Sequence, residues 1–424
     1  MSHIDFIGKI LDLKDPNIIF NENYYSEEYI KGLRYKIFHA KLSYRPTACQ
    51  RCGTIFDSNI IKHGFKASKI KLPYVSGVPT ILRLEKQRYI CRHCNSTFTL
   101  NTSEVAKNCC ISRNSKLHNA IDAKKKISEK DIALQNGVSH STVSRIIDSA
   151  YINYHAKRNF LPKHLCFDEF KSVKEASGAM SFIFCDADSK QIVDIVENRR
   201  LNYLKTYFLS FTRSARLSVK AVVIDIYTPY IQLIKSLFPN AKIIFDRFHV
   251  VQQFHRALNN TRIQLMKKND QHYKKLKAYW KLLLKASDKL DRTRLRYNRH
   301  FRKQMLQSDI VEFLIALDPT LKECYDLYQG VCAAIKLKNN ALFWTLIDAP
   351  HENLSEQMSR AVRTMKKHRD FVDNAITYPF SNGLIEGINN KIKVIKRIAF
   401  GYRSFVHFKN RILITQNLVK LKTA

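Results

Sequence analysis

The chain has 424 residues, 45% of them apolar, and its 72 lysines and arginines against 36 aspartates and glutamates give a net charge of +36. This composition excludes a chain that is disordered throughout, allows two to four folded units, and makes a polyanion the natural partner, with nucleic acid ahead of an anionic membrane. We find no apolar run near the roughly 20 residues that cross a bilayer and no signal-peptide pattern, so we expect a cytoplasmic protein that does not bind membranes.

Two pairs of cysteines near the start of the chain share the spacing C-x₂-C. They lie in "ACQRCGTIF" and "QRYICRHCNSTF" and comprise Cys49, Cys52, Cys91 and Cys94. Each pair presents two thiolates from one tight turn, which suits a tetrahedral Zn²⁺ ion, whereas four unrelated buried cysteines would not share this spacing. The gap between the pairs is longer than usual, so we expect a β-hairpin or small sheet to fill it. The sequence thus predicts a structural zinc ribbon within residues 1–105, whose first forty-odd residues indicate no role of their own.

Residues 129–148, "EKDIALQNGVSHSTVSRIID", have the pattern of helix, tight turn and helix. Apolar residues recur at helical spacing on both sides of Gly137, which supplies a positive φ between the helices. An ordinary pair of packed helices has the same pattern, but the charge and the neighbouring cysteine pairs favour a helix-turn-helix DNA-binding domain over residues 106–160. The side chains that its second helix would present to the major groove are His140, Ser141, Thr142, Ser144 and Arg145.

A mixed α/β pattern begins near residue 161. Up to residue 255, apolar runs and helical segments follow the order β-β-β-α-β-α-β, which predicts a mixed sheet flanked by helices. A helical pattern then dominates residues 256–375, and within residues 256–303 there are 16 lysines and arginines against three aspartates. These cations suit phosphate contacts, and the aromatic residues between them suit either base stacking or a place in the core. Residues 376–424 form a last helical segment.

Two aspartates follow the apolar runs of predicted parallel strands. Asp168 closes "LCF" and Asp225 closes "VKAVVI". In a sheet ordered 3-2-1-4-5 the first and fourth strands are neighbours, so both carboxylates would lie at the edge where open α/β sheets bind ligands. Carboxylates bind Mg²⁺ or Mn²⁺, and two such ions about 4 Å apart would support an in-line phosphoryl transfer.

A third acid, Glu386, stands among cations in "SNGLIEGINNKIKVIKR". Helical spacing places Glu386, Asn390, Lys393 and Arg397 on one stripe of a helix. The apolar residues opposite that stripe are Leu384, Ile388, Ile392 and Ile395. A solvated surface helix would have the same sequence pattern. Because two aspartates are also predicted at strand ends, we interpret Glu386 as the third metal ligand and the cations as phosphate contacts.

Further polar residues compete for these roles. Asp246 ends the run "AKIIF" on the fifth strand, one place farther from Asp168, and we assign it an accessory role together with His249 and Asn390. His249 would contact phosphate or simply pack. Asp186 and Asp188, in "CDADSK", are typical of a turn between the second and third strands.

These residues in their order resemble the bacterial insertion-sequence transposases of the ISL3 family. The resemblance rests on the cysteine pairs, the helix-turn-helix pattern, "FDEF", "IDIYTPY", "DRFHV" and the stretch "SNGLIEGINNKIKVIKRIAFGYRSFVHFKNRIL". It implies an RNase-H-like catalytic domain, in residues 161–255 and 376–424, with an all-α insertion at residues 256–375. The family's Asp, Asp, Glu triad falls on Asp168, Asp225 and Glu386. The departures are Tyr227 and Thr228, where smaller residues are expected, and Ser404, where Asn is common.

The resemblance implies a DNA transposase that binds the terminal inverted repeats of its element and performs Mg²⁺-dependent strand cleavage and strand transfer. Two Mg²⁺ or Mn²⁺ ions would lie on the triad, Zn²⁺ would be structural, and double-stranded DNA at the element ends and at the target would be the partner. Pairing of two ends suggests a homodimer or larger assembly on DNA, associated with the bacterial nucleoid. The alternatives are a catalytically silent DNA-binding regulator derived from a transposase, or a metal-dependent nuclease without strand joining.

Overall fold

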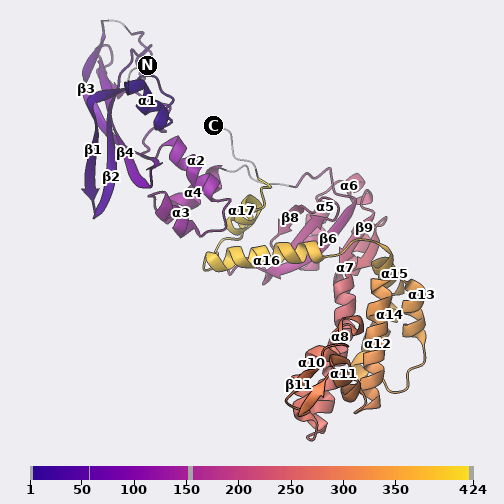
Figure 1. Cartoon of the computed structure of the whole chain (residues 1–424). Coiled ribbons are helices and arrows are strands. Elements are labelled where there is room, and N and C mark those ends of the chain that lie inside the picture. Colours follow the sequence, from indigo (N-terminus) through magenta and orange to yellow (C-terminus); the bar gives the residue numbers. More distant parts are fainter. Residues whose placement is uncertain (1–2, 57, 151–155, 420–424) are drawn as a thin grey trace. The chain divides into compact units, whose positions relative to one another are not determined.

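The computed structural model describes residues 3–56, 58–150 and 156–419, which fall into two compact units (Figure 1). One unit combines Met1–Tyr154 with Ile392–Ala424, and the other is His155–Lys391. We had expected the whole of residues 376–424 with the α/β unit, whereas the part after Lys391 clusters with the N-terminal unit. No helix in the described part of the chain is long and apolar enough to cross a membrane.

The first unit contains a five-stranded sheet with the order β1-β2-β4-β3, to which β5 adds by pairing with β4. Its elements are α1 (His3–Ile10), β1 (Ile18–Ile30), β2 (Leu33–Leu42), β3 (Ile60–Val75), β4 (Val78–Cys91) and β5 (Ser96–Thr99). Both long hairpins turn through two residues with positive φ, Lys31 with Gly32 and Ser76 with Gly77, as right-handed strand twist favours. The first forty-odd residues, for which the sequence indicated no role, therefore supply α1 and two strands of this sheet.

Helices complete the first unit. They are α2 (Arg113–Asp122), α3 (Glu129–Gln135), α4 (His140–Ala150) and α17 (Phe405–Thr415). Ser128 begins α3 with a capping box to Asp131, and Gly137 between α3 and α4 has φ +61°. A Cβ atom at Gly137 would lie 2.9 Å from the Tyr74 hydroxyl, so both the backbone and the packing require glycine. Ser404 accepts the His407 N–H and caps α17, a role that the family's common Asn performs equally well.

The second unit is built on a sheet with the order β10-β9-β6-β7-β8. The strands are β6 (His164–Lys171), β7 (Met180–Asp186), β8 (Ile192–Val196), β9 (Ala221–Ile224) and β10 (Lys242–Phe245). β6, β9 and β10 are parallel neighbours, and β7 and β8 are antiparallel. The predicted mixed sheet with the order 3-2-1-4-5 is thus confirmed. Helices α5 (Leu201–Leu209), α6 (Arg213–Leu217) and α7 (Thr228–Leu237) accompany it, and the buried rings of Phe167 and Phe208 stack in the core beside α5.

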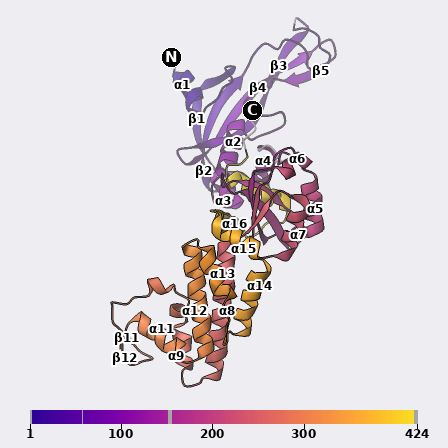
Figure 2. The same cartoon turned by 90° about the vertical axis from the view of Figure 1, so that its right-hand side faces the viewer.

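A helical bundle follows β10 (Figure 2). Its helices are α8 (Arg247–Lys268), α9 (Tyr273–Ala278), α10 (Trp280–Leu283), α11 (Gln307–Ile315), α12 (Pro319–Lys336), α13 (Asn340–Asp348), α14 (Glu356–Lys367) and α15 (Arg369–Thr377), with a 3₁₀ turn η1 (Ser287–Lys289). α8 packs against α12 and α14, and α15 packs on β10. The predicted all-α insertion is corrected in one respect, because a hairpin of β11 (Arg296–Asn298) and β12 (Lys303–Met305) interrupts it.

The helix α16 (Gly383–Ile398) carries the stretch in which Glu386 stands. Ile388, Ile392 and Ile395 are buried, as the helical spacing predicted, and Ile385 is buried with them. The side chain of Leu384 lies outside what the structure describes. Since α16 begins before residue 391 and ends after it, one continuous helix belongs to both compact units.

Candidate active site

Three aspartates lie at the same level of the sheet: Asp168 within β6, beyond its last pair with β9, and Asp225 and Asp246 directly after β9 and β10. Cys166 on β6 pairs with Val223 on β9, so Asp168 and Asp225 each lie two residues beyond the same rung. Phe245 on β10 pairs with Ile224 on β9, so Asp246 and Asp225 each come one residue later. Because the carboxyl ends of parallel strands meet at one edge, the register itself gathers Asp168, Asp225 and Asp246 there.

Asp225, Asp246 and His249 form the tightest part of this cluster. Their ligand atoms all lie within 4.8 Å of one another, and His249 Nε2 is 3.3 Å from Asp225 Oδ1. Asp246 is 3% exposed and precedes α8, whose first turn carries His249. The motif "DRFHV" therefore lies beside Asp225 because α8 starts directly at the end of β10.

Two asparagines that the sequence analysis did not single out hold these acids in place. Asn382 donates its backbone N–H to Asp246 Oδ1 (3.1 Å) and its side-chain amide to Asp225 Oδ1 (3.3 Å). Asn389 donates to Asp168 Oδ2 at 2.8 Å. Both side chains are buried, and neither Oδ1 atom has a hydrogen-bond partner among the described residues. The only sequence signal for them was their position on either side of Glu386.

Burial and like charge dominate the electrostatics of the carboxylates. Burial, together with the charge of Asp225, raises the pKa of Asp168 to about 7, against the hydrogen bond from the Glu169 N–H. Burial and the charge of Asp246 raise the pKa of Asp225 to about 6, against the hydrogen bond from Asn382. Groups of like charge held together in this way favour a cation between them.

The residues present fit a divalent cation. Carboxylate oxygens are the preferred ligands of Mg²⁺ and Mn²⁺, and Mg²⁺ usually keeps several of its water molecules. The buried, unpartnered Oδ1 atoms of Asn382 and Asn389 lie next to the acids, where they would accept hydrogen bonds from such waters. Asp168 and Asp225 are the residues that would hold the ion, with Asp246 beside Asp225.

Glu386 lies on α16 one turn before Asn389 and Asn390. Its side chain is exposed, and among the described residues its carboxylate is not part of the group formed by Asp225, Asp246 and His249. Asn390 is also exposed, and its neighbour Asn389 is the residue that contacts Asp168. Lys393 and Arg397, which are also exposed, lie farther along the same helix. Asp225, Asp246 and His249 thus form one cluster, Asp168 shares a cavity with Asp225 and His249, and Glu386 is exposed.

A cavity of about 220 Å³ opens beside the acids. Asp168, Asp225 and His249 line it, and the remaining lining side chains include Tyr227, Tyr230, Gln252, Gln253 and Arg256. His249, Gln252 and Arg256 follow helical spacing on α8, a signal that was visible in the sequence. The departure at Tyr227 therefore places an aromatic ring at the cavity, and Thr228 begins α7.

Glu169, the neighbour of Asp168, points elsewhere. It forms an ion pair with Arg199 and accepts a hydrogen bond from the Tyr230 hydroxyl at 2.9 Å. Its charge is thus balanced by a guanidinium within the protein. Asp186 is the last residue of β7 and accepts the N–H of Asp188 in the turn that follows, where the sequence indicated a turn.

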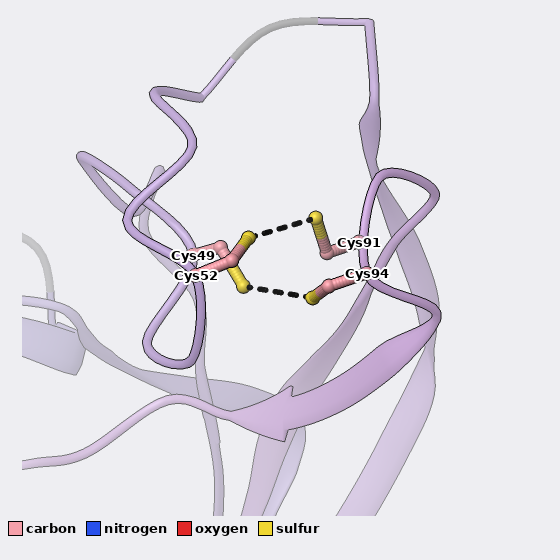
Figure 3. A group of neighbouring side chains, drawn as sticks. All are labelled: Cys49, Cys52, Cys91 and Cys94. Atoms are coloured by element: carbon pink, nitrogen blue, oxygen red, sulfur yellow. Dashed lines mark hydrogen bonds between the residues drawn. The ribbon is translucent and has the colours of Figure 1, made fainter.

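The four cysteines of the first unit converge at one point (Figure 3). Cys49 Sγ lies 3.7 Å from Cys94 Sγ, and Cys52 Sγ lies 3.8 Å from Cys91 Sγ. A tetrahedron with Zn–S bonds of about 2.3 Å has S···S edges of about 3.8 Å, so the thiols fit Zn²⁺ without rearrangement. The backbone N–H groups of Cys52 and Arg51 lower the pKa of Cys49, and the Thr54 hydroxyl lowers that of Cys52 to about 5, which favours thiolates at these two positions. Against the hydrogen bond from the Cys94 N–H, burial and the side-chain hydrogen bonds with Cys94 and Cys52 raise the pKa of Cys91 to about 11.

The side chains predicted to meet DNA on α4 divide into two groups. His140, Ser141 and Arg145 are exposed, while Thr142 and Ser144 are half-buried. Arg145 donates to the Ser141 carbonyl and the Thr142 hydroxyl, both at 3.3 Å, so its guanidinium is held along the helix surface. The exposed face of α4 is polar over its first two turns.

Comparisons with known proteins extend over most of the chain. The ISL3 family of DDE transposases, described as "Transposase", matches residues 165–412, which is more than half of the chain. The family described as "zinc-finger of transposase IS204/IS1001/IS1096/IS1165" matches residues 45–94, which contain all four clustered cysteines.

Curated relatives match parts of the chain. It is 27% identical over 253 residues to the "Transposase for insertion sequence element IS1001" of Bordetella parapertussis, covering 58% of this chain and 59% of that protein. It is 38% identical over 110 residues to a Lactococcus lactis subsp. lactis protein named "ATP-dependent protease", covering 26% of this chain and 35% of that protein. A Mycobacterium tuberculosis protein, "Transposase for insertion sequence element IS1557", is 50% identical over 40 residues, or 9% of each chain. The chain thus spans less than two thirds of the length of each of these relatives.

Proposed function

This chain belongs to the ISL3 family of DDE transposases, and on that premise we propose that it binds the terminal inverted repeats of an insertion sequence and catalyses Mg²⁺-dependent DNA strand cleavage and strand transfer. The observation that carries the proposal is the convergence of Asp168, Asp225 and Asp246 at one sheet edge, with raised pKa values at the first two. The sheet order, with its antiparallel and parallel halves, suits an RNase-H-like domain.

The roles of the chain's own residues follow from their positions. Asp168 and Asp225 would hold the divalent cations, and Asn389 and Asn382 would fix the directions of their carboxylates. Bound cations would lower the pKa of an attacking water or 3′-hydroxyl and stabilise the leaving oxygen. Asp246 and His249, next to Asp225, would orient the Asp225 carboxylate or contact the scissile phosphate.

Glu386 would join the site when DNA binds. As the exposed acid one turn before Asn389, it is free to approach the cations when the phosphates of bound DNA contact Lys393 and Arg397 on the same helix. The triad of the proposal is therefore Asp168, Asp225 and Glu386, with Asp246, His249 and Asn390 as accessory groups.

The DNA contacts would be divided among several parts of the chain. α3 and α4 would act as a helix-turn-helix, with α4 entering the major groove, and the zinc ribbon would assist recognition of the element ends. The basic bundle would contact phosphates. Because two ends must be paired, a homodimer or larger assembly on DNA is part of the proposal. Equal cleavage kinetics with one isolated end and with paired ends would contradict that part.

The test is incubation of the purified protein with labelled duplexes that carry the flanking ends of the element, in Mg²⁺. Asp168→Asn and Asp225→Asn should abolish both cutting and joining while leaving binding intact. Glu352→Gln is the matched control, because it removes an exposed carboxylate of the same unit, away from the cavity. Cut ends without joined products would indicate a nuclease, and binding without cutting by the unaltered protein would indicate a DNA-binding regulator.

A further inference from the structure

A hollow of about 980 Å³ lies in the first unit beside the zinc-binding cysteines. Its walls are β3, β4, β5 and residues 100–109, and its rim includes Gln50 and Arg51 of the first cysteine turn. We call this hollow the ribbon groove. Five cations line it, namely Arg51, Lys66, Lys86, Arg88 and Lys107. None of its lining residues is an aspartate or glutamate, so the whole groove is positively charged.

Strand register concentrates this charge. Lys66 on β3 pairs directly with Lys86 on β4, and Arg88 lies two residues along β4 on the same face. Like charges directly opposite one another destabilise an antiparallel pair. Burial, and after it the charge of Lys66, lower the pKa of Lys86, in keeping with two ammonium groups that face each other across the ladder. The fold therefore keeps an unfavourable arrangement that an anion would relieve.

Among the described residues, no acid relieves this repulsion. In the described part of the chain, no ion pair joins any of the five cations to a carboxylate, although Arg83, which lies on the other face of β4, does pair with Glu28. The polar lining between the cations consists of hydroxyl and amide side chains such as Ser68, Thr97, Thr99 and Asn101. Hydroxyls, amides and cations together are the groups that contact phosphate oxygens in protein–DNA complexes.

We propose that the ribbon groove binds the phosphodiester backbone of double-stranded DNA, as a contact separate from that of α4. This inference rests on the proposed function for the identity of the polyanion. The groove is open along the sheet, and its cations are spread over two strands and a loop, which suits successive phosphates of one DNA strand. The proposal thus gives the zinc-bearing sheet an affinity for DNA that does not depend on base sequence.

The experiment compares two triple variants of the full chain. The groove variant combines Lys66→Gln, Lys86→Gln and Arg88→Gln, and the control variant combines Lys36→Gln, Lys62→Gln and Lys69→Gln, which removes the same charge from residues that do not line the groove. Fluorescence anisotropy of an element-end duplex and of a random duplex is measured from 50 to 300 mM salt. Retained zinc and an unchanged circular dichroism spectrum establish that each variant is folded.

If the three cations hold phosphates, the slope of log affinity against log salt should fall by about 2.7, which is about 0.9 for each contact. Extrapolated on that slope, affinity at 0.15 M salt should fall on the order of 100-fold for both duplexes. The single variant Lys107→Gln, in the loop and outside the sheet, should lower the slope by about 0.9, which tests the groove without altering a strand.

Two results would overturn the inference. One is a groove variant with the same slope as the control variant. The other is an RNA duplex that binds as tightly as DNA through the same residues, which would assign the groove to RNA. Failure of the proposed function is a separate result, because it would appear as absence of cleavage by the unaltered protein, whereas failure of this inference leaves cleavage intact and the groove variant indistinguishable from the control.

Discussion

His407 joins the C-terminal helix α17 to the helices α3 and α4. Its Nδ1 lies 2.8 Å from Asp148 Oδ1, and its Nε2 lies 2.8 Å from Glu129 Oε1. Since each ring nitrogen faces a carboxylate, both must donate, and the ring is an imidazolium. Burial of the ring lowers its pKa, but the hydrogen bonds and charges of Glu129 and then Asp148 outweigh burial and raise the pKa from 6.5 to about 9.

The raised pKa of His407 sets the size of the stabilisation and the direction in which it changes with pH. A rise of about 2.5 pKa units corresponds to about 3 kcal/mol of stabilisation of the folded first unit. The half-exposed Asp148 is screened by solvent, so about 2 kcal/mol is the realistic value. Because the folded pKa is raised, this stabilisation is fully present below pH 6.5 and is lost as the pH rises through about 9. The other groups near the ring are His140, 3.8 Å from Glu129, and Tyr402, whose ring centroid is 5.9 Å away.

Hydrogen exchange read by mass spectrometry is the suitable assay. Both tryptophans, Trp280 and Trp344, lie in the second unit, so their fluorescence does not report on α4 and α17. We expect amides of α4 and α17 to lose about 2 kcal/mol of protection between pH 7 and pH 10, after correction for the intrinsic rate. His407→Gln should show the same loss already at pH 7.

The matched control is His351→Gln. His351 is as buried as His407, with 17% of its side chain exposed against 16%, but it faces one carboxylate, Glu323, and lies in the second unit. Its replacement should leave the exchange of α4 and α17 unchanged. Protection of these helices that is equal at pH 7 and pH 10, with His407 intact, would refute the ion-pair account.

Three further predictions concern the proposed activity. Removal of zinc by a chelator should weaken binding to element ends more than binding to random DNA, and unchanged discrimination in a titration would give the cysteine cluster another role. Glu386→Gln should keep DNA affinity and lose cleavage, because it removes charge with little change of shape, and a parallel loss of affinity would make Glu386 structural. Asn389→Ala removes a hydrogen bond to a carboxylate worth about 2 kcal/mol, so we expect single-turnover cleavage to slow by on the order of 30-fold with affinity unchanged. The exposed neighbour Asn390→Ala should have the smaller effect if contact with Asp168 decides the rate.

The sequence by itself determined the elements whose signal is local. Cys49, Cys52, Cys91 and Cys94 could be paired because two thiolates on one tight turn are recognisable from spacing alone, and the sulfurs do converge. The alternation of apolar runs and helices predicted the strands themselves, and in a sheet of the assumed order 3-2-1-4-5, which the structure has, Asp168 lies beside Asp225. These predictions depend on periodicity within about ten residues, which the chain displays directly.

Only the tertiary structure decided which groups meet across long separations. Asn389 and Asp168 are 221 residues apart and Asn382 and Asp225 are 157 residues apart, so no local pattern distinguishes Asn389 from Asn390. The same holds for the ribbon groove, whose charge arises because register sets Lys66 opposite Lys86. Helical spacing predicted the buried face of α16, but not which surfaces pack against that face. Such contacts are fixed by packing and strand register, and these are properties of the folded chain as a whole.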